Sequence, residues 1–232
     1  MLPIVILAGG LGTRLGSLTE NTPKCLLKVN HKPFIDIQLE LLQKAGYSEA
    51  FLCLSHYAEK VIEHVGNGKR FGMNIEYSLD GADQLGTGGA IRKVLPKLGP
   101  EFALIYGDSY LPIDYKIVED AFLESGAPGL MTVFENRDNL DVSNVEFFNN
   151  KVKIYSKNPS EAMSYIDYGL SYLRSEVFEP YEIDQPFDLA VLLSRLSIDG
   201  KLAGFEVFER FFEIGSTKGI KELSLYLEEI GK

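Results

Sequence analysis

The chain has 232 residues, of which 45% are hydrophobic and 24% charged, as is typical of a globular domain. Its net charge of −10 and the lack of a Lys/Arg cluster argue against nucleic acid as a partner. No apolar run is long enough for a membrane span, and two cysteines, Cys25 and Cys53, cannot build a disulfide framework or a four-ligand metal site. We therefore expect a cytoplasmic protein with no membrane partner.

Strand-like and helix-like segments alternate through the first half of the chain. Residues 3–8 form an apolar run typical of a strand buried on both faces, and residues 33–45 predict a helix with Ile35, Leu39 and Leu42 on one side. This alternation predicts an α/β fold. Further strands are expected over residues 50–55, 74–78, 102–106 and 129–134, and further helices over 57–65 and 89–98.

The second half of the chain favours antiparallel pairing. Asn149-Asn150 is a plausible tight turn between strands over residues 145–148 and 151–156. A final helix is expected to begin near Ser216 and to bury Ile220, Leu223, Leu227 and Ile230. Other strands are expected over residues 165–174, 202–207 and 211–214, with a helix over 187–196. We predict one three-layer, Rossmann-like α/β domain over residues 1–232, with a mixed, mostly parallel central sheet and a smaller antiparallel subregion.

A glycine-rich segment, Gly9-Gly10-Leu11-Gly12, follows the first strand directly. Glycines let backbone N–H groups approach a phosphate closely, and Arg14 adds a fork of donors. The chain has no GxxxxGK[ST] string of a P-loop. The dinucleotide-binding pattern GxGxxG also fails, because Leu15 stands where the third glycine belongs. A plain glycine turn remains the structural alternative.

Together with Pro23-Lys24, this loop resembles the signature of the sugar-1-phosphate nucleotidyltransferases, a G-G-x-G-T-R-L loop followed by P-K. The resemblance implies that Arg14 and Lys24 are catalytic. The arginine would hold the departing pyrophosphate, and the lysine would bridge the phosphates around the reacting α-phosphorus. The nucleotide-binding residues implied for this loop are Leu7, Ala8, Gly9, Gly10, Gly12 and Thr13.

A second glycine-rich string, Gln84-Leu85-Gly86-Thr87-Gly88-Gly89-Ala90, precedes a predicted helix. A free helix N-terminus offers backbone N–H groups to a ligand, although a loop that merely caps the helix would look the same. The family has an L-G-T-x-x-A element that lines its nucleobase pocket. The resemblance therefore assigns Gln84, Gly86, Thr87 and Gly88 to the base.

Two acidic residues are candidate ligands for Mg²⁺. Asp108 follows the predicted strand 102–106, and α/β sheets bind ligands outside the carboxyl ends of their strands. Mg²⁺ takes one or two protein carboxylates and completes its shell with phosphates and water. The resemblance implies that Asp108 is one ligand. Glu213 is implied as the other, at a position where the family usually has the shorter aspartate.

Three residues of the second half are implied to bind the acceptor. The family often has E-K-P after a strand, with the lysine on the sugar phosphate; here Ser156 replaces the acid and Asn158 follows Lys157. Charge alone leaves Lys157 equally open to being a solvated hairpin lysine. Gly169 would allow close approach of a sugar, and Asp167 could accept hydrogen bonds from its hydroxyl groups.

The resemblance implies a Mg²⁺-dependent enzyme that joins a nucleoside triphosphate to a sugar 1-phosphate and releases pyrophosphate. Residues 1–135 would mainly bind the nucleotide and residues 136–232 mainly the sugar phosphate. The strings around Gly86 and Glu213 resemble guanylyltransferases for heptose or mannose 1-phosphate, whereas residues 64–72 resemble uridylyltransferases for N-acetylmuramic acid 1-phosphate. An inactive nucleotide-sugar-binding protein of the same fold is the alternative from another class. The sequence is compatible with a homodimer.

Overall fold

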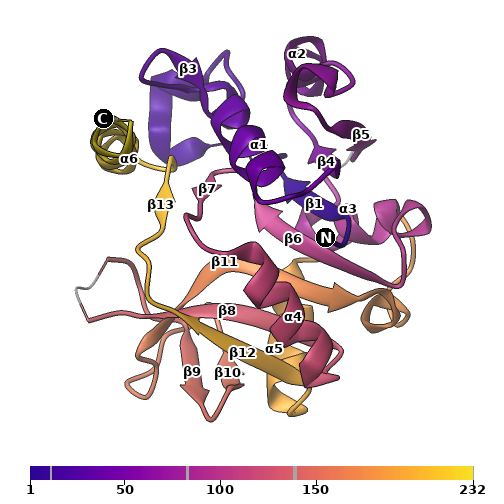
Figure 1. Ribbon diagram of the computed structural model, residues 1–232. Helices are drawn as coiled ribbons and strands as arrows, with labels where there is room; N and C mark the ends of the chain where they lie inside the picture. Colours follow the sequence, from indigo (N-terminus) through magenta and orange to yellow (C-terminus); the bar gives the residue numbers. More distant parts are fainter. Residues whose placement is uncertain (11, 82–83, 138–139, 232) are drawn as a thin grey trace.

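A nine-stranded sheet, counted over the described residues, runs through the middle of the molecule in the order β5-β4-β1-β6-β11-β8-β12-β10-β9 (Figure 1). The structure is a computed structural model, and it describes residues 1–10, 12–81, 84–137 and 140–231. The strands of the sheet are β1 (Ile4–Leu7), β4 (Glu49–Leu54), β5 (Asn74–Leu79), β6 (Glu101–Tyr106), β8 (Gly129–Glu135), β9 (Val145–Phe148), β10 (Lys151–Tyr155), β11 (Tyr165–Arg174) and β12 (Leu202–Val207).

The sheet is parallel at one end and mixed at the other. β1 lies between β4 and β6 and is parallel to both, so Leu7 is in register with Cys53 and with Tyr106. β11 runs antiparallel to β6, β8 and β9. The predicted mixed sheet is confirmed, and its antiparallel strands continue the parallel part. The strands β1, β4 and β6 therefore end at one edge, and the loops that follow them meet there.

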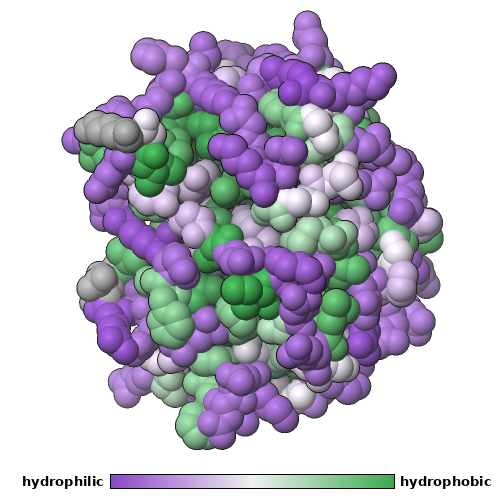
Figure 2. All heavy atoms as spheres, in the orientation of Figure 1, coloured by the Kyte–Doolittle hydropathy of each residue, from purple (hydrophilic) through white to green (hydrophobic). Residues whose placement is uncertain are grey.

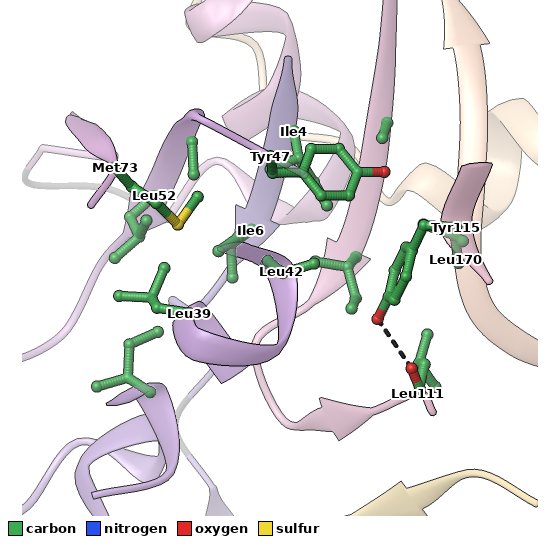
Figure 3. Packing of buried hydrophobic residues seen from close by; sticks show 14 of the residues in the cluster. Ile4, Ile6, Leu39, Leu42, Tyr47, Leu52, Met73, Leu111, Tyr115 and Leu170 are labelled. Atoms are coloured by element: carbon green, nitrogen blue, oxygen red, sulfur yellow. Dashed lines mark hydrogen bonds between the residues drawn. The ribbon is translucent and has the colours of Figure 1, made fainter. Parts of the chain in front are cut away.

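Helices cover both faces of the sheet. α1 (Phe34–Lys44), α2 (Ala58–Val65) and α4 (Tyr115–Ser125) pack on one face, and α3 (Gly86–Val94) and α5 (Leu189–Ile198) pack on the other. Successive side chains of β1 point to opposite faces of the sheet, so this strand contributes to both layers. Ile4 and Ile6 belong to the hydrophobic cluster under α1, α2 and α4, which we call the first core cluster, and Val5 belongs to the cluster under α3 and α5. Figure 3 shows the first cluster, where the Tyr115 hydroxyl donates to the Leu111 carbonyl at 3.0 Å. The predicted three layers are confirmed.

The C-terminal helix α6 (Thr217–Ile230) packs against a small group of elements beside the sheet. Its N-cap is Ser216, as predicted, and the serine hydroxyl accepts from the Gly219 N–H at 2.9 Å. Leu223 is buried as predicted. Ile230 is 56% exposed, contrary to the prediction, because the last turn of the helix extends beyond the core that the earlier turns contact. The neighbouring short strands are β2 (Lys28–Val29), β3 (Lys32–Pro33), β7 (Ser109–Tyr110) and β13 (Phe212–Glu213).

The remaining elements are short 3₁₀ helices: η1 (Thr13–Thr19), η2 (Lys24–Leu26), η3 (Lys69–Phe71), η4 (Leu95–Lys97) and η5 (Ser175–Phe178). The predicted tight turn is confirmed, since Asn149 and Asn150 both have positive φ, 50° and 55°. Figure 2 shows hydrophilic side chains over most of the face in view, with hydrophobic atoms in scattered groups. None of the described helices combines the length and the apolar character needed to cross a membrane.

Candidate active site

A cavity of about 490 Å³ lies where β1, β4 and β6 end. Its wall comes from loops that are far apart in the sequence. Most of the predicted nucleotide-binding residues line the cavity. Its full lining is Leu7, Ala8, Gly9, Gly10, Gly12, Lys24, Cys25, Cys53, Asp80, Gln84, Gly86, Thr87, Ala90, Tyr106, Gly107, Asp108 and Gly215. A cleft of this size at the carboxyl edge of a sheet is a typical small-ligand site.

The first wall of the cavity is the loop after β1. The Ala8 N–H donates to the Cys53 carbonyl at 3.0 Å and so ties the start of the loop to β4. Gly12 has a φ of 65°, which favours glycine, and a Cβ there would lie 2.9 Å from the Thr19 Cγ2 atom. Gly10 differs, because a Cβ added there would meet no atom within 4 Å. The fold therefore requires glycine at position 12 but leaves open space at position 10.

Two predicted residues of this loop, Thr13 and Arg14, cannot be followed to the side chain. Leu11 and the side chains of Thr13 and Arg14 lie outside the described residues. The backbone of Thr13 and Arg14 begins η1, directly after Gly12. The catalytic role of Arg14 stays a prediction.

Lys24 and Asp108 meet in the cavity. The Lys24 ammonium donates to the Asp108 carboxylate, and their side chains are 13% and 31% exposed. They are 84 residues apart in the chain, so only the fold brings the predicted catalytic lysine to the predicted metal ligand. An ion pair that remains open to a cavity can exchange its partners for a phosphate and a cation.

Asp108 follows a glycine that the fold requires. A Cβ at Gly107 would lie 2.7 Å from the Cβ atom of Ala8, so β6 can end this close to β1 only with glycine at that position. The Gly107 N–H donates to the Leu7 carbonyl at 2.9 Å, and the Ile214 N–H donates to the Asp108 carbonyl at 3.0 Å. The Gly-Asp pair recognised in the sequence thus forms a turn that is fixed from both sides.

Glu213 lies near this turn, but its carboxylate is bound by its own segment. β13 pairs with β7, which places Glu213 opposite Ser109. The carboxylate accepts from the Gly215 N–H and, at 2.7 Å, from the Ser216 hydroxyl. It therefore helps to cap the start of α6, and the cavity wall contains Gly215 instead of Glu213. A direct metal contact by Glu213 stays a prediction.

The second wall of the cavity is the start of α3. Gln84, Gly86 and Thr87 line the cavity, but Gly88 does not. Gly88 packs on the segment before α5: its N–H donates to the Phe187 carbonyl at 3.0 Å, and an added Cβ would lie 2.1 Å from a Phe187 ring carbon. The helix begins at Gly86, earlier than predicted, because these contacts offset the low helix propensity of glycine.

Lys157 is held by a carboxylate that the sequence analysis missed. Its ammonium donates to Asp188, the N-cap of α5, and the Thr87 hydroxyl donates to the other Asp188 oxygen at 3.2 Å. Burial acts to raise the pKa of Asp188, but Lys157 and the Ala190 N–H outweigh it and lower the pKa below its ordinary value. The ion pair connects the predicted acceptor side to the base-side wall. Asp188 lies in the first turn of the predicted helix 187–196, but no sequence signal indicated its partner.

Asp167 and Gly169 lie where β11 departs from regular pairing. The Gly169 N–H donates to the Asp167 carboxylate at 3.0 Å, and Gly169 has a φ of 105°. Burial raises the pKa of Asp167 to about 6, against the opposing effect of the Gly169 N–H. The cavity residue Tyr106 lies nearby: burial first, and then the charge of Asp167, raise the pKa of its hydroxyl. The acceptor candidates thus adjoin the cavity through Tyr106.

Asp80 is another cavity residue that sequence reasoning missed. It directly follows β5, and its carboxylate accepts from the Leu85 N–H at 3.3 Å, beside Gln84. Burial raises its pKa, partly opposed by the Leu85 N–H and the charge of Lys93. The signal used for Asp108, an acid at the carboxyl end of a strand, would have found it.

Residues 4–185, more than half of the chain, match the family model described as nucleotidyl transferase. The chain belongs to this family. The family that the sequence resembled is therefore confirmed. Among its relatives, a D-glycero-alpha-D-manno-heptose 1-phosphate guanylyltransferase from Campylobacter jejuni is 39% identical over 110 residues, 47% of this chain and 49% of the relative. Another protein of that name, from Aneurinibacillus thermoaerophilus, is 26% identical over 229 residues, 96% of this chain and 99% of the relative.

The alignments to the first three relatives span about half of those proteins, from 48% to 57% of their length. Among solved structures, HddC from Yersinia pseudotuberculosis complexed with GMP-PN is similar at a TM-score of 0.82 and 25% identity, covering 98% of this chain and 100% of that one. The similarity extends over nearly the whole chain, so the predicted Rossmann-like fold is confirmed.

Proposed function

We propose that this chain transfers a nucleotidyl group from a nucleoside triphosphate to a sugar 1-phosphate and releases pyrophosphate, with Mg²⁺ as cofactor. The observation that carries the proposal is the Lys24–Asp108 pair in a cavity whose first wall has open space at Gly10. A cation, a carboxylate and an unobstructed glycine loop are the parts that a triphosphate and its metal need. Family membership supports the same reaction.

The proposed reaction requires little proton transfer by the protein. A phosphate oxygen of the acceptor attacks the α-phosphorus, the bond from that phosphorus to the bridging oxygen breaks, and pyrophosphate leaves with the bonding electrons. The nucleophile is already an anion, so no strong general base is needed. Repulsion between anions and the alignment of the attacking and leaving oxygens set the barrier. Lys24 can reduce the repulsion at the α-phosphate, and Lys157 can hold the acceptor phosphate.

The residues present fit a magnesium ion. Within the described ranges no three His, Cys, Asp or Glu side chains are grouped so that they could hold a metal alone. Mg²⁺ bound with a nucleotide does not need such a group, since it takes one or two carboxylates and completes its shell with phosphate oxygens and water. Asp108 would hold it, with Glu213 as the second candidate. When bound, the ion would supply positive charge to the phosphates.

Asp80 supports guanine as the base. The Watson–Crick edge of guanine carries two adjacent donors, N1–H and the N2 amino group, and a carboxylate accepts from both. Uracil offers one N–H between two carbonyl oxygens, which a carboxylate would repel. Asp80 and Gln84 lie together at the base-side wall, and we therefore favour GTP over UTP. For the acceptor, Lys157 and Asp167 suit a phosphorylated sugar with free hydroxyls, and heptose or mannose 1-phosphate is our choice.

The test is pyrophosphate release with Mg²⁺, measured for GTP, UTP, CTP, dTTP and ATP against heptose, mannose, glucose and N-acetylmuramic acid 1-phosphates. GTP with heptose or mannose 1-phosphate should exceed all other pairs. A preference for UTP with N-acetylmuramic acid 1-phosphate would select the uridylyl alternative. Nucleotide binding without release from any pair would contradict the proposal and favour an inactive binding protein, for which the use of Glu213 in capping α6 is the supporting observation.

The role of Asp80 has its own test in the same assay. Asp80→Asn keeps the size of the side chain but replaces one acceptor with a donor. The ratio of kcat/KM for GTP to that for UTP should fall by about tenfold, because a bidentate contact to a base edge discriminates by about 1–3 kcal/mol. An equal fall for both nucleotides would assign Asp80 to the Leu85 N–H alone. The matched control is Glu76→Gln, a partly exposed acid on β5 that does not line the cavity.

A further inference from the structure

Gln38 is a fully buried polar residue on an otherwise apolar side of α1. Its exposed fraction is 0%, and its helix neighbours Ile35, Leu39 and Leu42 are buried at 0% in the first core cluster. The cost of burying an amide is offset only by the hydrogen bonds that it makes. Packing alone would be served as well by a methionine or leucine at this position.

The amide of Gln38 holds both sides of the Asp108 turn. Its Nε2 group donates to the Tyr106 carbonyl at 2.9 Å and to the Ser109 carbonyl at 2.8 Å. These carbonyls flank Gly107-Asp108. The orientation of the amide follows from chemistry, because the reverse would place its oxygen against two carbonyl oxygens. One side chain therefore fixes the backbone before and after the predicted metal ligand.

The other end of the same amide has no partner. The Oε1 atom of Gln38 is buried and accepts no hydrogen bond from any described residue. Such an unsatisfied acceptor costs free energy, and it can be retained where the group serves something other than stability. Both donors of Gln38 are used at the turn, and its acceptor is left unused.

Backbone hydrogen bonds also attach the turn to neighbouring strands. The Gly107 N–H is bound to Leu7, and the Asp108 carbonyl to the Ile214 N–H. Gln38 binds the Tyr106 and Ser109 carbonyls with one amide group, and the backbone between them carries the Asp108 carboxylate that Lys24 contacts.

From this geometry we infer that Gln38 is a positioning residue for Asp108: its amide clamps the carbonyls on either side of the turn and holds the carboxylate where Lys24 and the cation meet. The inference rests on the proposed function for its effect on turnover. Its effect on cation binding does not depend on which nucleotide or sugar phosphate is used. Groups that orient a metal ligand typically change metal affinity or activity by about 10–100-fold when removed.

The variant that tests this is Gln38→Met, which fills nearly the same space and removes both donors. Gln43→Met is the matched control, because Gln43 is exposed on the same helix. We expect Gln38→Met to lower kcat by about 10–100-fold, to change the KM for GTP by less than about threefold, and to raise the half-saturating Mg²⁺ concentration by about tenfold. Gln43→Met should leave all three unchanged.

A readout besides activity is Mn²⁺ binding in the presence of GTP without acceptor, followed by the loss of the free Mn²⁺ resonance. Gln38→Met should bind Mn²⁺ about tenfold more weakly than the wild type. This measurement stands even if the wild type releases no pyrophosphate from any pair, so failure of the proposed function and failure of the inference are separable. Wild-type Mn²⁺ affinity and wild-type kcat in Gln38→Met would overturn the inference.

A second variant covers the case in which Gln38→Met does not fold. Gln38→Glu retains one donor in its protonated form, and burial raises the pKa of a carboxyl group, so this form becomes more populated as pH falls. It should keep at least about tenfold more turnover than Gln38→Met, or at least a tenth of the wild-type turnover if that variant is lost. Its turnover relative to the wild type should rise as pH falls from 8 to 6. A flat ratio at the wild-type level would contradict the clamp, since a packing role predicts no such pH profile.

Discussion

Gly10 and Gly88 each belong to a glycine-rich string beside the cavity, but an added methyl group would meet different surroundings at the two positions. At Gly10 nothing lies within 4 Å, whereas at Gly88 the Phe187 ring lies 2.1 Å away. Gly10 lines the cavity and Gly88 does not. The first string leaves room for something that is not part of the chain. The second makes room for the segment before α5, while its neighbours Gly86 and Thr87 still face the cavity.

This difference separates two reasons for a glycine that look the same in sequence. A glycine can be needed because another part of the chain lies close, and then substitution costs stability. It can also be needed because a ligand approaches, and then substitution costs binding while the fold tolerates it. Glycine strings therefore predict close approach, and only the structure says what approaches.

The largest effect is expected from Lys24→Met. The variant keeps the apolar stem and removes the charge that reaches Asp108. Loss of one group that stabilises charge in the transition state should lower kcat/KM by about 10²–10³-fold. Stability should change by less than about 1 kcal/mol, because the pair is partly open to solvent. Lys28→Met, an exposed lysine nearby in the chain, is the control. Normal turnover in Lys24→Met would remove Lys24 from the mechanism.

Gly88→Ala tests the second wall as a packing site. The added methyl group would overlap the Phe187 ring, so we expect a loss of about 1–3 kcal/mol in the free energy of unfolding. For a chain of this size each kcal/mol corresponds to roughly 2–4 °C in Tm, which thermal unfolding can detect. Adding Phe187→Leu should recover part of the loss. An unchanged Tm combined with a raised KM for the nucleotide would reverse the assignment and return Gly88 to the base pocket.

Gly10→Ala is the counterpart at the first wall. We expect an unchanged Tm, because the position is exposed and free of contacts, and a KM for the triphosphate raised by about tenfold. Gly99→Ala is the matched control, since a Cβ there also meets nothing within 4 Å and the residue does not line the cavity. If Gly10→Ala bound nucleotide normally, the open space at position 10 would lack the role assigned to it.

Much of the fold followed from the sequence where burial alone decides the pattern. The predicted limits of β11 and β12 match the structure, because both strands cross the core and their burial is visible in the sequence as a periodic pattern of apolar residues. The start of α3 was missed because contacts with Phe187, distant in the chain, override the helix propensity of three glycines. The burial of Ile230 was predicted wrongly, because the apolar stripe of α6 continues in the sequence beyond the core that could bury it.

The site was predictable in its motifs and not in its pairings. Gly9, Gly10 and Gly12, which come after β1, converge with Asp108, which comes after β6, on one cavity that also contains Lys24. No periodicity indicates that Asp188 holds Lys157, that Glu213 turns back to cap α6, or that Gln38 reaches two carbonyls of another loop. Such contacts depend on the register between distant elements, which a local pattern does not contain.

Asp167 extends the comparison to the acceptor side, where the same question applies to a carboxylate: does it serve the chain or a ligand? Burial raises its pKa to about 6, so the folded state binds a proton more readily than the unfolded state. The free energy of unfolding should therefore fall as pH rises from about 4 to about 6 and stay lower above that window. Two pKa units correspond to about 3 kcal/mol at most, and partial exposure to water reduces this to roughly 1–2 kcal/mol.

Asp167→Asn should remove this penalty while keeping an acceptor for the Gly169 N–H. The variant should match the wild type in stability near pH 4 and exceed it by roughly 1 kcal/mol above pH 6, measured by denaturant unfolding across pH. Asp199→Asn, at an exposed position, should show no such divergence. A carboxylate kept at a stability cost is expected where a ligand uses it, so Asp167→Asn should also raise the KM for the sugar phosphate. Greater stability with an unchanged KM would place Asp167 with Gly88, among the residues that serve the chain itself.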